Sequence, residues 1–204
     1  MTEQIEQLEA YKFIGDPQTD AQNWKNLTHR NIRAAEKRGQ FIRKFGFVLF
    51  SEQTLEEIVE FNRRILSIGC GCGYLEHWLR KYGARMHVTD IQTLKNNSYG
   101  FIKRWTRVEV MSHRVAMDMY SKPGVAILIS WPHFDVTWDA EVLDKIHDGQ
   151  KLIYIGEGVG DCTGSKPFHQ KLEKEFTKCG GAHIYSWFGI HDRCEFYTKG
   201  SKDD

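Results

Sequence analysis

An apolar run that leads directly into three closely spaced glycines constrains the fold of this chain more than any other segment. Residues 65–68, with the sequence Ile-Leu-Ser-Ile, predict a short buried strand, and residues 69–73 follow as G-x-G-x-G. Leu75 and Leu79 come next at the spacing of one helix face. Glycines at such a strand-to-helix turn allow a tight bend and close approach of a ligand, and the helix N-terminus offers free N–H groups. The segment therefore predicts a strand–turn–helix unit with a ligand-binding turn.

Apolar runs and helical patterns alternate along most of the remaining sequence. Predicted strands cover residues 65–68, 86–89, 107–111, 125–130, 151–156, 182–188 and 194–198. One predicted helix begins after a capping pattern at Ser51, a second extends from Leu75 to Gly83, and a third ends near Trp105. Two more cover residues 136–147 and 167–178. Strands that alternate with helices indicate a mainly parallel sheet, and a closing pair without a helix between its strands indicates an antiparallel strand. We therefore predict an α/β fold: a Rossmann-like, mainly parallel seven-stranded sheet with helices on both faces, an antiparallel last edge strand and extra N-terminal helices.

The N-terminal part of the chain differs from this alternating pattern. Residues 1–14 predict an acidic helix, a Gly-Asp-Pro break follows it, and residues 20–45 predict a second helix. We expect residues 1–62 to form a helical extension or lid, and residues 63–200 to form the Rossmann-like domain. Residues 25–44 carry seven Lys/Arg and one acid, so a nucleic acid is a possible partner there, although a solvated helix face is the commoner explanation.

Composition excludes several other classes of protein. The 28 basic and 27 acidic residues leave a net charge of +1, which gives no global argument for an acidic partner. No apolar run approaches the ~20 residues that cross a bilayer, and the acidic N-terminus lacks the apolar core of a secretory signal, so we expect no membrane association and a cytoplasmic location. The five cysteines show no disulfide pattern. Cys70 and Cys72 form C-x-C without a second pair, so we expect no metal site.

An acidic residue ends the second predicted strand. Asp90 lies 21 residues after Gly69 and can accept hydrogen bonds from the two ribose hydroxyls of an adenosine ligand. The dinucleotide pattern G-x-G-x-x-G fails here, because Tyr74 stands where its third glycine belongs. The G-x-G-x-G form instead resembles the motif of class I S-adenosylmethionine-dependent methyltransferases, which implies S-adenosylmethionine as the cofactor. A glycine-rich turn without a ligand is the alternative.

The resemblance implies which residues hold this cofactor. They are Ser67, Gly69, Gly71, Gly73, Asp90, Ile91, Ser130 and Trp131. One position departs from the pattern, since such enzymes commonly carry an acid two residues before the first motif glycine and this chain has Ser67. A serine can form a hydrogen bond, but it cannot form an ion pair with the amino group of the ligand.

Five further short segments are distinctive. They are Phe45-Gly46-Phe47-Val48, Ser130-Trp131-Pro132, Tyr154-Ile155-Gly156-Glu157-Gly158, Gly160-Asp161-Cys162-Thr163-Gly164 and Phe188-Gly189-Ile190-His191-Asp192-Arg193. Together they resemble the landmarks of an uncharacterised family of methyltransferase-like proteins found in bacteria and elsewhere, over roughly residues 45–198. This resemblance implies the methyltransferase fold and suggests no substrate.

Candidate reaction residues follow strands whose carboxyl ends meet at one edge of the sheet, where ligands bind in open α/β folds. The segment 130–133, Ser-Trp-Pro-His, loosely resembles the Asn/Asp/Ser-x-Pro-aromatic motif of amino-group methyltransferases. His133 and Glu157 are candidate general bases, and Trp131 or Phe47 offers an aromatic face to a sulfonium or a flat substrate. His191 lies before the last strand and can reach the site from the sheet edge. Packing and loop hydrogen bonds are the alternative roles of these side chains.

Four functions follow from these features. We expect an active S-adenosylmethionine-dependent methyltransferase whose methyl acceptor the sequence does not identify. A non-catalytic methyltransferase-like binding module is an alternative that Ser67 favours. A nucleic-acid methyltransferase would use the basic N-terminal helix, and its binding would weaken steeply with salt. A nicotinamide oxidoreductase is disfavoured by Tyr74. The sequence does not indicate an oligomeric state.

Overall fold

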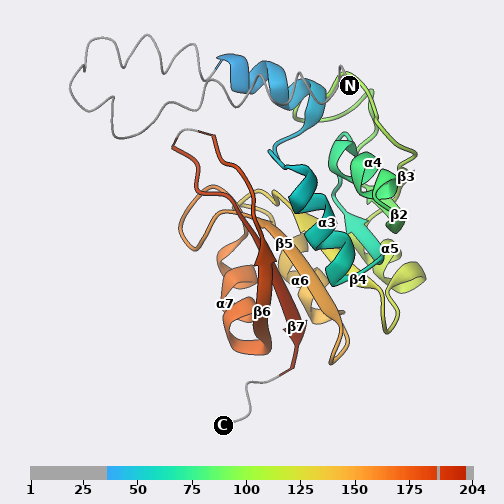
Figure 1. The fold of residues 1–204 in the computed structure, drawn as a ribbon, viewed down its shortest axis with the longest axis vertical. Coiled ribbons are helices and arrows are strands. Elements are labelled where there is room, and N and C mark those ends of the chain that lie inside the picture. Colours follow the sequence, from blue (N-terminus) through green and yellow to red (C-terminus); the bar gives the residue numbers. More distant parts are fainter. Residues whose placement is uncertain (1–35, 188, 201–204) are drawn as a thin grey trace, which may run out of the picture.

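A seven-stranded sheet forms the centre of the computed structural model, which describes residues 36–187 and 189–200 (Figure 1). In chain order its strands are β1 (Arg64–Ile68), β2 (Arg85–Asp90), β3 (Glu109–Val110), β4 (Ala126–Ser130), β5 (Lys151–Gly156), β6 (Phe176–Ala182) and β7 (Arg193–Lys199). Their order across the sheet is β3-β2-β1-β4-β5-β7-β6. Neighbouring strands are parallel except where β7 pairs with β5 and with β6. The predicted Rossmann-like sheet with an antiparallel last strand is confirmed, and that strand lies one place inside the edge.

Helices cover both faces of the sheet, as predicted (Figure 1). On one face lie α3 (Glu52–Phe61), α4 (Tyr74–Lys81) and the helical residues 36–45; on the other lie α5 (His113–Tyr120), α6 (Trp138–Asp144) and α7 (Lys166–Glu175). The core accordingly divides into two clusters, and strand side chains alternate between them: Ile65 and Leu128 belong to the first cluster, Leu66 and Ile127 to the second. Strand positions buried on both faces explain the near-continuous apolar runs of the sequence.

The predicted start of α3 is confirmed by its capping contacts. The Ser51 side chain accepts a hydrogen bond from the Thr54 N–H at 3.2 Å, and the Thr54 hydroxyl oxygen accepts one from the Ser51 N–H at 3.0 Å. The expected start of α7 is also found, because Ser165 caps it and Pro167 stands in its first turn.

The helix predicted to end near Trp105 is wrong. Residues 91–108 contain neither helix nor strand, and side-chain contacts with the backbone hold them in an irregular loop. Asn97 accepts a hydrogen bond from the Phe101 N–H at 2.7 Å, and the Arg104 guanidinium donates to the carbonyls of Gln92 and Gly71. Asparagine side chains compete with the helical hydrogen bonds of the backbone, which favours such a loop over a helix.

The sixth strand begins earlier than the predicted strand 182–188. The chain leaves α7 at Glu175 and enters β6 directly, and β6 ends at Ala182. Glycines usually weaken a strand, yet Gly181 is needed here, because a Cβ at this position would lie 2.5 Å from the Cys194 carbonyl oxygen of β7. The glycines therefore lie inside β6, where they allow the backbones of β6 and β7 to approach closely. The helix predicted to reach residue 178 ends three residues sooner, at Glu175.

The predicted helix 1–14 and residues 20–35 of the second predicted helix lie outside the described residues. Residues 36–45 are helical and insert Phe41 and Phe45 into the first core cluster. The boundary between an extension at 1–62 and a domain at 63–200 stays a prediction. In the described part of the chain, no helix has the length and apolar character needed to cross a membrane.

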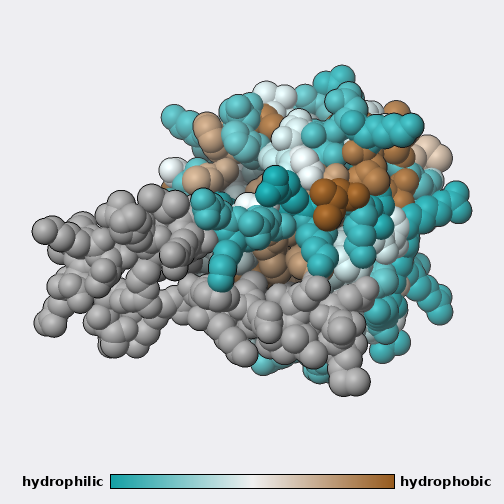
Figure 2. Space-filling model, turned by 90° about the horizontal axis from the view of Figure 1, so that it is seen from above, coloured by the Kyte–Doolittle hydropathy of each residue, from teal (hydrophilic) through white to brown (hydrophobic). Residues whose placement is uncertain are grey.

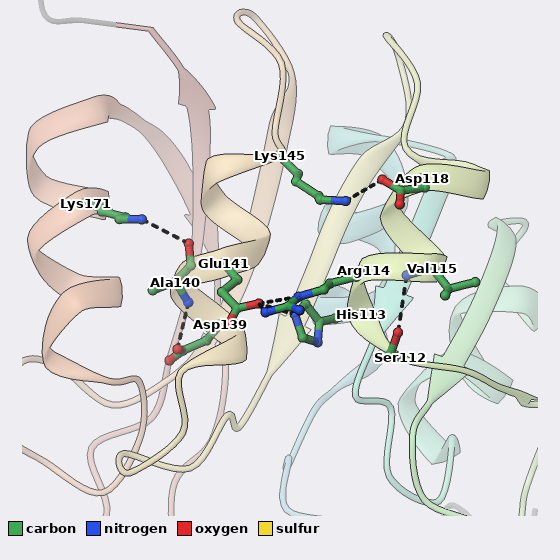
Figure 3. A network of polar contacts seen from close by, with 10 residues as sticks. All are labelled: Ser112, His113, Arg114, Val115, Asp118, Asp139, Ala140, Glu141, Lys145 and Lys171. Atoms are coloured by element: carbon green, nitrogen blue, oxygen red, sulfur yellow. Dashed lines mark hydrogen bonds and ion pairs between the residues drawn. The ribbon is translucent and has the colours of Figure 1, made fainter.

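Polar contacts join the three helices of the second face (Figure 3). Asp139 of α6 is fully buried, and its carboxylate accepts hydrogen bonds from the Ala140 N–H at 2.7 Å, from the Ser165 N–H at 2.7 Å and from the Ser165 hydroxyl at 2.8 Å. This side chain therefore fixes the start of α7 against α6. By contrast, Lys145 pairs with Asp118 of α5 at the surface, where the Asp118 side chain is 68% exposed.

Replacing Asp139 by alanine should reveal this buried junction. Asp139→Ala leaves the N–H and hydroxyl of Ser165 buried without a partner, so we expect the free energy of unfolding to fall by about 3 kcal/mol in urea titrations. Asp118→Ala removes a surface ion pair and should change the same free energy by no more than about 0.5 kcal/mol. Equal effects of the two substitutions would contradict the role given to Asp139.

Candidate functional site

A cavity of about 290 Å³ lies at the carboxyl edge of the parallel strands. Its walls come from the turn after β1, from the ends of β2 and β4, from the loop 97–104 and from the aromatic segment 45–50. Six of the eight predicted cofactor residues line it: Gly69, Gly71, Asp90, Ile91, Ser130 and Trp131. Its position is the one at which open α/β sheets bind ligands, and its size lies near the lower end of small-molecule pockets, roughly 300 Å³.

The three motif glycines adopt backbone conformations that other residues rarely take. Their φ angles are +71° at Gly69, +58° at Gly71 and +74° at Gly73. A Cβ at Gly69 would lie 3.1 Å from the Trp138 ring, and one at Gly73 would lie 2.9 Å from a Thr106 methyl group. Gly73 does not line the cavity, so its part is to shape the turn and to cap α4.

Asp90 connects the end of β2 to the glycine turn. One carboxylate oxygen accepts a hydrogen bond from the Gly71 N–H at 2.8 Å, and the other accepts one from the Gln92 N–H at 2.7 Å. Burial raises the pKa of this carboxyl, while the two N–H donors and the Arg104 guanidinium oppose the rise. Each oxygen keeps a second lone pair, so Asp90 can accept a ribose hydroxyl while it holds the turn.

Ser67 lies beneath the cavity and contacts an acid that the sequence analysis did not select. Ser67 is buried, does not line the cavity, and donates a hydrogen bond from its hydroxyl to Oε1 of Glu76 at 2.7 Å. Glu76 stands on the first turn of α4, is 1% exposed and does line the cavity. Burial raises the pKa of Glu76 to about 7, against the opposing effect of the Ser67 hydroxyl. An acidic residue at a buried position of an apolar helix face was the signal that could have identified it.

Trp131 forms one boundary of the cavity. Its φ of +51° is a strained value for a residue with a side chain, and its N–H donates to the Ile155 carbonyl at 2.8 Å. The indole stacks on Phe47 with ring centroids 4.9 Å apart and planes 11° from parallel. The Arg38 guanidinium lies 5.3 Å from the same indole. The strand end and the aromatic segment thus hold this ring in a defined position.

His133 is the predicted catalytic residue that reaches the cavity wall. Its Nδ1 lies 2.5 Å from Oδ1 of Asp135, and its side chain is 44% exposed. The contact engages one ring nitrogen, so Nε2 is the nitrogen left to exchange a proton. An antiparallel bridge between His133 and Thr163 attaches this loop to the loop after β5.

Glu157 and His191, the other two predicted catalytic residues, do not line the cavity. The buried Glu157 carboxylate accepts hydrogen bonds from the His191 N–H at 2.9 Å and from the Cys162 N–H at 3.1 Å. It therefore ties together the loops that follow β5 and precede β7. Glu157, Asp161 and His191 also place one ligand atom each within 4.8 Å of one another, an arrangement that could hold a metal ion.

The two cysteines of the glycine turn are poor nucleophiles. Burial raises the pKa of the Cys70 thiol well above its ordinary value and that of Cys72 to about 12. Both thiols are therefore protonated at neutral pH, whereas thiolate is the reactive form.

Some basic residues of the predicted nucleic-acid region contact aromatic rings. Residues 25–35 lie outside the described residues. Arg38 lies over Trp131, and the Lys44 ammonium is 5.0 Å from the Phe45 ring centroid. Among the described residues on the face shown in Figure 2, most are hydrophilic and a group of hydrophobic residues lies between them.

Asp192 is a second buried acid that the predicted site did not include. Among the described residues, neither of its carboxylate oxygens has a hydrogen-bond partner, and the same holds for the Trp131 indole nitrogen. Burial raises the pKa of Asp192 to about 7; the Trp131 indole and the Arg38 guanidinium oppose this rise, and the Glu157 charge adds to it. Asp192 therefore belongs to a group of interacting side chains with Trp131, Arg38 and Glu157, and it does not line the cavity.

Comparison with known proteins finds distant similarity. No protein-family model and no curated protein sequence matches the chain. Among solved structures, magnesium protoporphyrin IX methyltransferase from Synechocystis PCC 6803, with bound S-adenosylmethionine, is 13% identical with a TM-score of 0.47 over 95% of this chain and 91% of that one. The apo form of the S-adenosylmethionine-dependent methyltransferase SibL is 12% identical with a TM-score of 0.47 over 96% of this chain and 68% of that one. Identities of this size carry over no residue roles.

The burial of Asp192 leads to a pH-dependent stability difference. Its folded-state pKa of about 7 lies above the unfolded value, so its ionisation destabilises the fold as the pH rises from about 4 to above 7. Asp192→Asn removes that ionisation, and we expect it to stabilise the protein relative to wild type by roughly 1–3 kcal/mol at about pH 8 and little at about pH 4. Thermal unfolding at both pH values measures the difference, with Asp118→Asn as the exposed control. A pH-independent difference would contradict the buried, unpartnered carboxyl.

Proposed function

We propose that this chain is an S-adenosylmethionine-dependent methyltransferase. The observation that carries the proposal is the junction between the glycine turn and Asp90. Gly71 and Asp90 are joined by a 2.8 Å hydrogen bond, and both line the cavity at the carboxyl edge of the sheet. A turn without bulky side chains beside a carboxylate acceptor suits the ribose of an adenosine ligand.

The other groups of the cavity match the remaining parts of this cofactor. Ile91 follows Asp90 and offers an apolar contact to the adenine, while the side-chain-free Gly69 lets a ligand approach the backbone of the turn. Trp131 and Phe47 present a stacked aromatic pair, whose faces attract a cation such as a sulfonium. The cavity is small for the whole cofactor, so we expect part of the ligand to extend past its mouth.

Methyl transfer from such a cofactor needs no covalent bond between the protein and the substrate. When bound, the cofactor supplies a methyl group on a positively charged sulfur. The protein must align the acceptor with that methyl group, exclude water, and remove a proton where the acceptor carries one. We assign the proton transfer to Nε2 of His133, because Asp135 engages the other ring nitrogen.

Glu157 and His191 have a supporting part in this proposal. The loop that contains Glu157 is bound to the 130–133 segment, since the Gly164 N–H donates to the Pro132 carbonyl at 2.8 Å. By holding this loop, Glu157 would shape the side of Trp131 from which an acceptor approaches. The chemical class of that acceptor is left open.

Binding of S-adenosylhomocysteine to an Asp90 variant tests the proposal. Asp90→Asn replaces a charged acceptor by a neutral one, so we expect the dissociation constant in calorimetry to rise about 10- to 100-fold. Asp118→Asn, on the opposite face of the sheet from the helical residues 36–45, should bind as wild type does. The melting temperature of each variant without ligand reports whether the fold is retained.

Four outcomes decide between the functions. Wild-type binding of S-adenosylhomocysteine, with loss in Asp90→Asn, supports the cofactor site. Binding of a nicotinamide dinucleotide instead would contradict it. Methyl transfer that is lost in His133→Ala while cofactor binding is kept would support catalysis, and a protein that binds the cofactor but transfers no methyl group to any tested acceptor would favour the binding module.

A further inference from the structure

Glu76 is a buried carboxylate in the wall of the cavity, and among the described residues its direct contact is with a neutral hydroxyl rather than with a cation. It is 1% exposed and receives the Ser67 hydroxyl at 2.7 Å. Among the described residues, no lysine, arginine or histidine lies within ion-pair distance of it. A buried carboxylate without a paired cation is costly for the fold, and a positively charged ligand group in the cavity would offset that cost.

The position of Glu76 relative to Ser67 gives the identity of that partner. Class I methyltransferases commonly carry an acid at the position that Ser67 occupies, and there it binds the amino group of the methionine part of the cofactor. In this chain the carboxylate of Glu76 comes from α4 and accepts a hydrogen bond from the Ser67 hydroxyl. The helix α4 thus supplies a carboxylate close to the position at which those enzymes have an acid on the strand.

Two acids of the cavity wall, Asp90 and Glu76, are placed to contact different parts of one ligand. Asp90 ends β2, which is paired in parallel with β1, so the Glu76–Ser67 pair and Asp90 lie at neighbouring strand ends. Both carboxylates line the same cavity. We propose, on the basis of the function proposed above, that Glu76 binds the α-amino group of S-adenosylmethionine and thereby takes the place of the acid absent at position 67.

Several other groups act on Glu76 from the surrounding elements. Asp90 of β2 and Arg80 of α4 influence its charge in opposite directions, and the neutral thiols of Cys70 and Cys72 lie near it in the glycine turn. Before ligand binds, burial raises the pKa of Glu76 to about 7. An ammonium group beside it favours the ionised form, so binding below neutral pH must release a proton.

Binding measurements with two ligands separate this contact from the rest of the site. S-adenosylhomocysteine carries the amino group, whereas 5′-methylthioadenosine shares its adenosine and sulfur but lacks the amino-acid part. Glu76→Gln keeps the size of the side chain and its hydrogen bond with Ser67, so we expect it to weaken S-adenosylhomocysteine about 10- to 100-fold and methylthioadenosine less than about twofold. Asp90→Asn should weaken both ligands. Calorimetry measures all four pairs.

The pH dependence gives a second readout. For wild type, we expect the affinity for S-adenosylhomocysteine to rise about tenfold from pH 6 to pH 8, with proton release visible as a dependence of the binding heat on the buffer. Glu76→Gln should lose this rise, and methylthioadenosine should show none with either protein.

The acid can also be moved back to the strand. In Ser67→Asp/Glu76→Gln the carboxylate comes from the end of β1, and we expect S-adenosylhomocysteine affinity to return to within about tenfold of wild type. Equal weakening of both ligands by Glu76→Gln, or no weakening of either, would overturn the assignment of Glu76. Failure of the wild-type protein to bind either ligand would instead overturn the cofactor proposal itself.

Discussion

The hydrogen bond from the Gly71 N–H to the Asp90 carboxylate is the contact on which the site depends. It joins the turn after β1 to the end of β2, and both strands are central enough in the sheet to be buried. The positive φ angles of Gly69 and Gly71 bring that N–H into position, and the Arg104 guanidinium secures the Gly71 carbonyl from the opposite side. A cavity can form at this edge because the turn presents backbone where other residues would present side chains.

Buried carboxylates in this fold fall into two kinds. Asp139 and Glu157 each accept hydrogen bonds from two backbone N–H groups, and each fastens one loop or helix start to another. Among the described residues, Glu76 accepts the Ser67 hydroxyl without a paired cation, and neither carboxylate oxygen of Asp192 has a hydrogen-bond partner. The first kind serves the fold at little cost in desolvation, whereas the second kind is costly unless a ligand or a proton compensates. Glu76 lines the cavity where binding is proposed, and Asp192 is influenced by the Trp131 indole that bounds the same cavity.

The parts of the site that follow from short stretches of sequence were predictable. The glycine turn and Asp90 are fixed by local strand and turn signals, so the fold class and most of the cavity wall could be predicted from them. Glu76 carried a weaker local signal, an acid on an otherwise apolar helix face, and its role depends on a tertiary contact with Ser67 nine residues earlier. The position of β6 was missed for a similar reason, since only pairing with β7 makes a strand of a segment with two glycines.

A crystal structure of the protein with S-adenosylhomocysteine tests the central claim most directly. The account predicts ligand density in the cavity at the carboxyl edge, with the ribose hydroxyls on Asp90 and the amino group within hydrogen-bond distance of Glu76. A ligand bound elsewhere, or one whose ribose does not contact Asp90, would contradict the site. A ribose on Asp90 with the amino group turned away from Glu76 would keep the cofactor site and contradict the role of Glu76.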